Sequence, residues 1–328
     1  MTEMKRWGGA LRFVAGALFL LIWPWIISEY WLQVTIVSGI FVILAVSLNL
    51  IQGYAGQLSI AHAAFYGVGA YASALLALRL GLSFWITLPL AGLFTGLLGF
   101  LIGIPSLTLR GHYLAIVTLG FGEIIYQVLE RWESMTQGVM GLKDIPRPTP
   151  IFGISFKGKL PYYYLLLSLI GLVVFLVHRI VNSRVGRALK SIREDEFCSQ
   201  ALGIATYRYK VTAFAIGTML AGLAGAFFAH YQQVLAPTEF TFLDSVRILM
   251  MVIVGGMGSI PGSVVGALLL VWLPEILRPI GDYRDLIYGA AVILIIIFMP
   301  GGLMEMLQRG ATFLQRHFAG IRERASPA

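Results

Sequence analysis

Five polar side chains lie within a run of 49 residues, 30–78, that contains no Asp, Glu, Lys or Arg. They are Asn49, Gln52, Gln57, Ser59 and His62. Amides, a hydroxyl and an imidazole can exchange hydrogen bonds with a polar solute. In apolar surroundings such groups either bond neighbouring helices or line an aqueous path. Glycines at 53 and 56 can break a helix beside this cluster, which favours the path.

Glu123 is the single acidic residue in another apolar segment, 111–129. A buried carboxylate is costly unless it is paired or protonated. Two roles therefore remain open for Glu123. It is either a polar contact in a transport path, for example to a substrate ammonium, or a fixed hydrogen-bonded acid that joins helices or lies near a helix end.

Signatures of covalent chemistry are absent from the sequence. It contains no GxxxxGK[ST] phosphate loop, no HExxH and no GxSxG motif. The five histidines, at 62, 112, 178, 230 and 317, form no metal-ligand pair at helical spacing. We therefore expect no metal site, no cofactor bound by this chain and no enzymatic activity of its own.

The composition indicates a membrane protein. Hydrophobic residues make up 58% of the 328 residues and charged residues only 12%, whereas a soluble domain carries roughly 25% charged residues. The chain cannot cover a water-facing surface of its own size, so it is not a soluble enzyme, a disordered protein or a nucleic-acid-binding domain, despite its net charge of +8. A single cysteine, Cys198, excludes a disulfide framework.

Charge-poor segments predict an all-α polytopic membrane protein with about ten transmembrane or partly inserted helices. The segments are 13–28, 30–78, 80–109, 111–129, 160–178, 211–238, 248–274 and 286–304. The second must fold back near 53–57, and the seventh is interrupted by glycines at 255–262, which gives ten. We interpret 13–28 as an uncleaved helix because no small-residue cleavage site follows it. A single transmembrane domain would cover 1–310, with a tail at 311–328.

Basic residues orient the chain. Lys and Arg gather at the N-terminus, in loop 179–210 and in the C-terminal tail, and the positive-inside rule assigns all three to the cytoplasm. Both termini inside require an even number of crossings. Loop 130–161 would then be external.

Several ordered motifs resemble one family, the permease subunits of branched-chain amino-acid ABC importers of the LivM type. They are SLNLIQGYAGQLSIAHAAFYGVGAY at 47–71, GHYLAIVTLGFGEI at 111–124, VGGMGSIPG at 254–262 and MPGGL at 299–303. The resemblance implies an importer subunit that forms half of the translocation path for leucine, isoleucine and valine by alternating access. Related permeases carry urea, amides or other small solutes, so these cargoes stay open. An ion-coupled secondary transporter is the alternative class, and a membrane-embedded enzyme is disfavoured.

The same resemblance implies partners and a location. The partners are a second homologous permease, two cytoplasmic ATPase subunits that hold ATP and Mg, and a periplasmic or extracellular solute-binding protein facing loop 130–161. The location is a bacterial or archaeal cytoplasmic (inner) membrane. The predicted path residues are Asn49, Gln52, Gln57, Ser59, His62, Thr118 and Glu123.

Loop 179–210 contains a predicted amphipathic helix. Val185, Leu189 and Ile192 recur at i, i+4 and i+7, which is one apolar helix face. Such a helix can lie on the lipid surface, but the resemblance makes it a coupling helix that docks in a groove of the ATPase. The expected docking residues are Arg184, Arg187, Leu189, Ile192, Arg193, Glu194, Glu196, Ala201 and Gly203.

Glycines mark the predicted breaks and close helix contacts. Those assigned to breaks and packing are Gly53, Gly56, Gly256, Gly258 and Gly262. GxxxG pairs such as Gly92/Gly96 and Gly99/Gly103 favour close helix packing. The spacing leaves open whether the neighbour is the same chain or a second permease.

Overall fold

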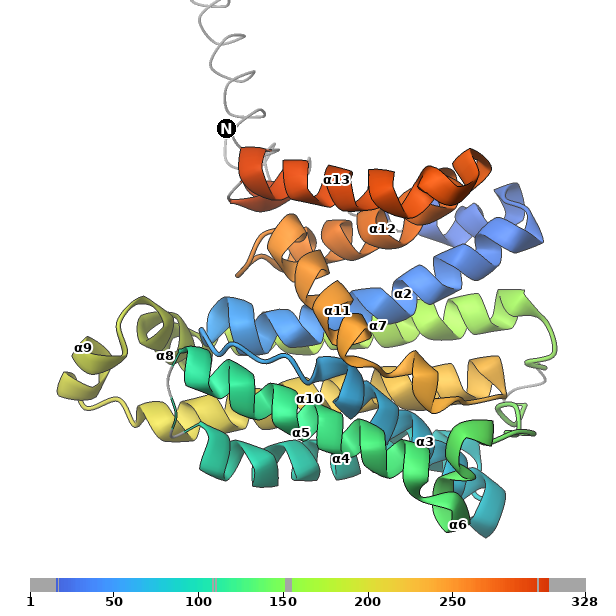
Figure 1. The fold of residues 1–328 in the computed structure, drawn as a ribbon, viewed down its shortest axis with the longest axis horizontal. Coiled ribbons are helices and arrows are strands. Elements are labelled where there is room, and N and C mark those ends of the chain that lie inside the picture. Colours follow the sequence, from blue (N-terminus) through green and yellow to red (C-terminus); the bar gives the residue numbers. More distant parts are fainter. Residues whose placement is uncertain are drawn as a thin grey trace, which may run out of the picture.

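The computed structural model describes residues 16, 18–107, 109, 111–150, 155–299 and 301–306, and every regular element among them is a helix. The start of the first expected helix and the expected tail 311–328 lie outside the described residues, while 18–26 are helical. Figure 1 shows the longer helices: α2 (Glu29–Asn49), α3 (His62–Leu80), α4 (Phe84–Ser106), α5 (His112–Arg131), α7 (Lys159–Val181), α10 (Thr206–Gln232), α11 (Phe242–Gly255), α12 (Ile260–Ile276) and α13 (Arg284–Phe298).

Short helices complete the chain. They are η1 (Leu50–Tyr54), α6 (Glu133–Thr136), η2 (Gly138–Met140), α8 (Arg184–Glu194), α9 (Glu196–Ala201), η3 (Pro237–Glu239) and η4 (Arg278–Tyr283). The first of these is a π-helical turn that directly continues α2.

Among the described residues, six helices are long and apolar enough to cross a membrane: α2 with η1, α3, α4, α5, α7 and α10. The other three apolar helices are shorter, at 14 residues for α11, 17 for α12 and 15 for α13. A perpendicular crossing needs about 20 residues. The prediction of an all-α multi-pass membrane protein is therefore confirmed.

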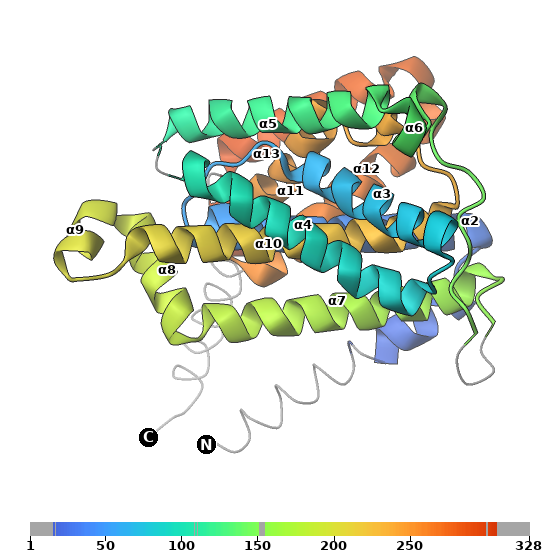
Figure 2. The same ribbon diagram turned by 90° about the horizontal axis from the view of Figure 1, so that it is seen from below.

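Helix α10 is the centre of the bundle and packs against α2, α3 and α4; Figure 2 shows it between α4 and α7. Small residues allow the close approach. A Cβ atom added to Gly92 would lie 2.6 Å from Leu223 Cδ2, and one on Gly96 would lie 2.9 Å from Met219 Cβ. The GxxxG surface of α4 therefore packs within the chain and is not free for a second permease.

The two long loops lie at opposite ends of the bundle (Figure 1). Helices α8 and α9 project at one end. At the other end, the segment after α6 pairs with the segment after α10, because Leu142 and Leu235 exchange backbone hydrogen bonds of 3.0 and 2.8 Å. The bundle thus separates two loop surfaces by its full length.

Candidate functional site

The first predicted break interrupts the chain between α2 and α3. The π turn ends at Tyr54, Gly56 adopts a φ of +67°, and residues 56–61 are not helical before α3 begins at His62. A positive φ favours glycine, because other residues meet a steric penalty there. The chain therefore runs back into the bundle as an irregular segment, and α3 starts partway along it (Figure 1).

Two hydrogen bonds hold this irregular segment to its neighbours. Thr118 on α5 accepts a 3.2 Å hydrogen bond from the Ile60 amide. At the start of α3, the Ala63 amide donates to Ser245 Oγ on α11 at 3.0 Å. Thr118, which the sequence assigned to the path, thus positions the irregular segment through its hydroxyl.

Polar atoms along this segment are buried and without hydrogen-bond partners among the described residues. They are Gln52 Oε1, both amide atoms of Gln57, Ser59 Oγ and His62 Nδ1. An unpaired buried polar atom costs about 1–3 kcal/mol. His62 does use its other nitrogen, since Nε2 lies 2.7 Å from Ser47 Oγ. Four of the predicted path residues therefore keep unused hydrogen-bonding capacity around one irregular segment.

Asn49 differs from these four residues. Its side chain is fully buried, and both ends of its amide are used: Oδ1 accepts from the Gly258 amide at 2.8 Å, and Nδ2 donates to the Ser259 carbonyl at 3.1 Å. The amide therefore joins the first break to the second and offers no free atom to a solute in this conformation.

The second break separates α11, which ends at Gly255, from α12, which begins at Ile260. Ser259 caps α12 by accepting a 3.1 Å hydrogen bond from the Gly262 amide. Glycine backbones meet directly here, because a Cβ on Gly262 would lie 2.5 Å from the Gly255 carbonyl oxygen. A Cβ on Gly302 would likewise lie 2.5 Å from Gly256 Cα. The second break is thus a compact glycine packing site.

Glu123 lies on the exposed side of α5, where it accepts a 3.0 Å hydrogen bond from Gln127 Nε2. The premise that this acid is buried within the chain is therefore wrong. Its neighbours on that side include Ile116 and Ile124, which are 66% and 58% exposed. A carboxylate facing lipid is costly, so this side of α5 suits a contact with protein or an aqueous path.

The amphipathic helix predicted in loop 179–210 is α8, which lies at one end of the bundle. Its Ser183 N-cap accepts a 3.1 Å hydrogen bond from the Val185 amide. Leu189 and Ile192 are only 0% and 5% exposed, because α8 packs against α7 and α10. The expectation that this apolar face enters an ATPase groove is corrected: the chain's own bundle already covers it.

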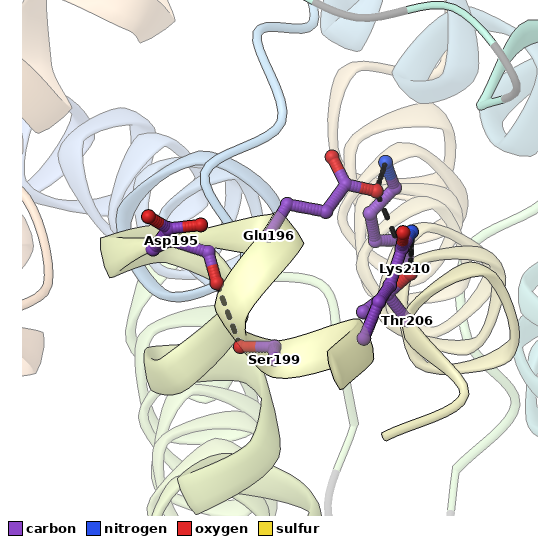
Figure 3. Close-up of polar contacts among 6 residues, drawn as sticks. Asp195, Glu196, Ser199, Thr206 and Lys210 are labelled. Carbon is purple, nitrogen blue, oxygen red and sulfur yellow. Dashed lines mark hydrogen bonds and ion pairs between the residues drawn. The ribbon is translucent and has the colours of Figure 1, made fainter. Parts of the chain in front are cut away.

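Helix α9 lies beyond α8 (Figure 1) and is fixed to the start of α10 by polar contacts (Figure 3). Glu196 forms a 2.9 Å ion pair with the buried Lys210. Asp195 caps the helix by accepting a 2.9 Å hydrogen bond from the Cys198 amide, and this bond lowers the pKa of Asp195. Glu196, expected at a docking rim, therefore has a role inside the fold.

Two large apolar side chains at α9 are largely exposed. Phe197 is 69% exposed and Leu202 is 79% exposed. The periodicity argument missed both, although an isolated Phe in a charged loop was a visible signal. Six of the expected docking residues are exposed as well: Arg184, Arg187, Arg193, Glu194, Ala201 and Gly203.

Arg193 is exposed but also reaches the bundle, where its Nη1 donates a hydrogen bond to the Gly53 carbonyl. One turn earlier, Lys190 Nζ lies 5.7 Å from the centre of the Tyr54 ring. Two cations of α8 therefore lie at the C-terminal end of the α2–η1 helix, where helix carbonyls favour positive charge.

Together these features define a class: a multi-pass membrane protein with an irregular polar segment inside its bundle and a separate helical loop surface at one end. Residues 30–298 match the family described as "Branched-chain amino acid transport system / permease component". The chain belongs to this family of transport permeases.

Relatives agree with that assignment. The chain is 37% identical over 319 residues to the high-affinity branched-chain amino acid transport system permease protein LivM of Escherichia coli (strain K12), covering 90% of this chain and 75% of the relative. It is 38% identical to LivM of Salmonella typhimurium (strain LT2), covering 87% and 72%. LivH of Escherichia coli (strain K12) is 24% identical, covering 80% and 91%. No solved structure matches the chain significantly.

Proposed function

We propose that this chain is a permease subunit of an ATP-driven ABC importer and forms half of the translocation path for leucine, isoleucine and valine. The family match over residues 30–298 carries the proposal. The likeness to LivM over most of the chain supports the cargo. Alternating access would come from helices that pack differently in an outward-facing and an inward-facing state of the bundle, and it would need no covalent chemistry.

The path would run past the irregular segment and the exposed side of α5. Gln57 and Ser59 keep free hydrogen-bonding atoms inside the bundle, which suits a zwitterion that must not be fully desolvated. Glu123 lies on the side of α5 that no part of this chain's described structure covers. A second homologous permease on that side would complete the path and shield the carboxylate from lipid.

The ATPase subunits would dock at α9. Exposed Phe197 and Leu202 supply an apolar contact, and exposed Arg187 and Glu194 supply a polar rim, the combination used in helix-in-groove docking. ATP and Mg would remain in those subunits. The basic loop and both termini would be cytoplasmic, in the inner membrane of a bacterium or archaeon. Loop 130–161, at the opposite end, would meet an external solute-binding protein.

Uptake by the reconstituted complex tests the cargo. Vesicles that contain this chain, the partner permease and the ATPases are supplied with binding protein and a panel of amino acids, urea and amides. Selective, ATP-dependent uptake of leucine, isoleucine and valine supports the proposal. Uptake of urea or an amide instead would change the cargo within the class. Uptake by this chain alone, driven by an ion gradient, would establish a secondary transporter.

A docking variant tests the ATPase surface. Leu202→Asp should reduce co-purification of the ATPase about tenfold while the permease still folds, because a charge enters an apolar contact. Charge reversal at Arg187 should weaken coupling less, because rim charges contribute little. The matched control is Met140→Asp, which also places a carboxylate at an exposed apolar side chain, in η2 at the opposite end of the bundle and 80% exposed. Undiminished ATPase binding by Leu202→Asp would remove α9 from the docking surface.

A further inference from the structure

The two helix breaks meet at one junction, which also receives a side chain from α8. The break junction consists of Asn49, Gly53, Arg193, Gly258 and Ser259. Asn49 spans the breaks with hydrogen bonds of 2.8 Å from the Gly258 amide and 3.1 Å to the Ser259 carbonyl. Arg193 donates to the Gly53 carbonyl. Residues more than 200 positions apart in the sequence are thereby joined through consecutive contacts.

The backbones at this junction touch each other. A Cβ atom on Gly53 would lie 2.5 Å from the Gly258 nitrogen, and one on Gly258 would lie 3.1 Å from the Gly53 oxygen and 2.6 Å from Arg193 Nη1. Close-packed interiors transmit displacement instead of absorbing it. A shift of either break must therefore move the other, or break the hydrogen bonds of Asn49.

The carbonyl that Arg193 binds belongs to a helix end that needs donors. Carbonyls in a last helical turn lack intrahelical partners. Here the Ile51 and Gln52 carbonyls accept from the Gln57 and Gly56 amides at 3.1 and 3.2 Å, and the Gly53 carbonyl accepts from Arg193. The hydrogen bond from Arg193 therefore holds the last helical turn before the irregular segment.

Helix α8 is also firmly joined to α9. The Ser191 and Ser199 hydroxyls lie 2.7 Å apart, and Ser199 Oγ donates to the Asp195 carbonyl at 2.8 Å. A load applied at the exposed tip of α9 would consequently displace α8. On α8, Arg193 is the residue that hydrogen-bonds to the first break among the described contacts.

We infer that Arg193 is a positioning residue that couples the α8–α9 unit to the break junction and so to the irregular segment 56–61. The inference rests on the proposed function, since it assigns the route by which ATPase movement reaches the path. The guanidinium holds the Gly53 carbonyl, Asn49 holds the second break to the first, and the irregular segment moves with them.

The test uses the full complex in proteoliposomes, with leucine uptake and ATP hydrolysis measured on the same vesicles. The variants are Arg193→Gln, which loses the cationic donor, and Arg193→Lys, which keeps a cationic donor. The control is Arg179→Gln, which removes an exposed arginine at the end of α7. The readout is leucine transported per ATP hydrolysed, which a loss of protein amount does not change by itself; thermal unfolding of each variant shows that the fold is kept.

Arg193→Gln should lower the transport ratio about tenfold, within the 5- to 150-fold range usual for coupling between sites, while the ATPases still co-purify. Arg193→Lys should recover part of the ratio, and Arg179→Gln should equal the wild type. An unchanged ratio in Arg193→Gln would overturn the inference. Loss of ATPase from that variant would also overturn it, because Arg193 would then be a docking residue. A wild-type complex without ATPase binding or uptake would instead overturn the proposed function.

Discussion

The two glycine-rich breaks differ in what they leave unpaired. At the first, buried atoms of Gln52, Gln57, Ser59 and His62 have no partner among the described residues. At the second, Ser259 caps a helix, and the Gly258 amide and Ser259 carbonyl both bond Asn49. A glycine-rich break therefore has two different outcomes in this chain. The first break leaves buried polar atoms without hydrogen-bond partners, and the second is a close-packed site whose polar groups are hydrogen-bonded.

This difference indicates different roles for the two breaks. Unpaired buried groups cost stability, so a chain that keeps them gains something else from them. The first break therefore suits a solute that passes by, and the second suits a mechanical contact. Three substitutions at the breaks test this division, and a fourth tests the proposed path at α5; they follow in order of decreasing effect.

The largest effect is expected at the second break. A Cβ on Gly255 would collide with the Gly262 carbonyl oxygen, so Gly255→Val should destabilise the bundle by about 3 kcal/mol through overpacking. The measurement is the yield and thermal unfolding of monodisperse protein in detergent. Gly171→Val, in a helix position with open space around the added carbon, is the control and should behave as wild type. Equal stability of the two variants would contradict a packed second break.

Asn49→Leu should cost about 2 kcal/mol of stability and also reduce uptake. The substitution leaves the Gly258 amide and Ser259 carbonyl without their partner. A fully buried group left unpaired costs about 1–3 kcal/mol, and these two backbone groups are half-buried, so the expected cost lies near the lower end for the pair. Thermal unfolding and transport are measured on the same preparation. Normal stability with low uptake would instead make Asn49 a solute contact like its neighbours.

Gln57→Leu should give the opposite pattern. Its two amide atoms have no partner to lose, so the unfolding temperature should stay equal or rise, because an apolar group replaces unpaired polar atoms. Leucine uptake should nevertheless fall about tenfold, or about 1.4 kcal/mol. A large loss of stability would show that Gln57 has a structural role, and would remove the contrast between the breaks.

Glu123→Gln should have the smallest effect, a several-fold loss of uptake with normal assembly. The glutamine keeps a hydrogen-bonding side chain on the exposed side of α5 but removes the carboxylate, which is worth most when it meets a cation directly. Uptake and complex assembly are compared with the double variant Glu123→Gln/Gln127→Glu, which moves the acid one turn along the same side. Unchanged uptake would remove Glu123 from the path.

Much of the helical architecture could be predicted from short stretches of the sequence. Long charge-poor runs identified the spanning helices, and the glycines at 53–57 and 255–262 coincide with the ends of η1 and α11. The i, i+4, i+7 pattern identified α8. These features depend on properties that neighbouring residues share: hydropathy over about 20 positions, helical periodicity and backbone freedom.

Site assignments were less predictable, because they depend on what lies opposite each side chain. Periodicity shows that Leu189 and Ile192 share a face, but only packing against α7 and α10 decides that the chain itself covers it. A single acid in an apolar segment is expected to be buried, but Glu123 lies on the exposed side of α5. Phe197 and Leu202 became candidates only through their exposure.

By itself, the sequence determined a helical multi-pass membrane protein of the branched-chain amino acid permease family, with two breaks and a basic amphipathic loop. Only the tertiary structure decided that the breaks meet, that Asn49 joins them across 209 positions, and that Arg193 reaches the first of them. The physical reason is that helices and breaks arise from short-range backbone preferences, whereas a hydrogen bond between distant segments exists only after the bundle has packed.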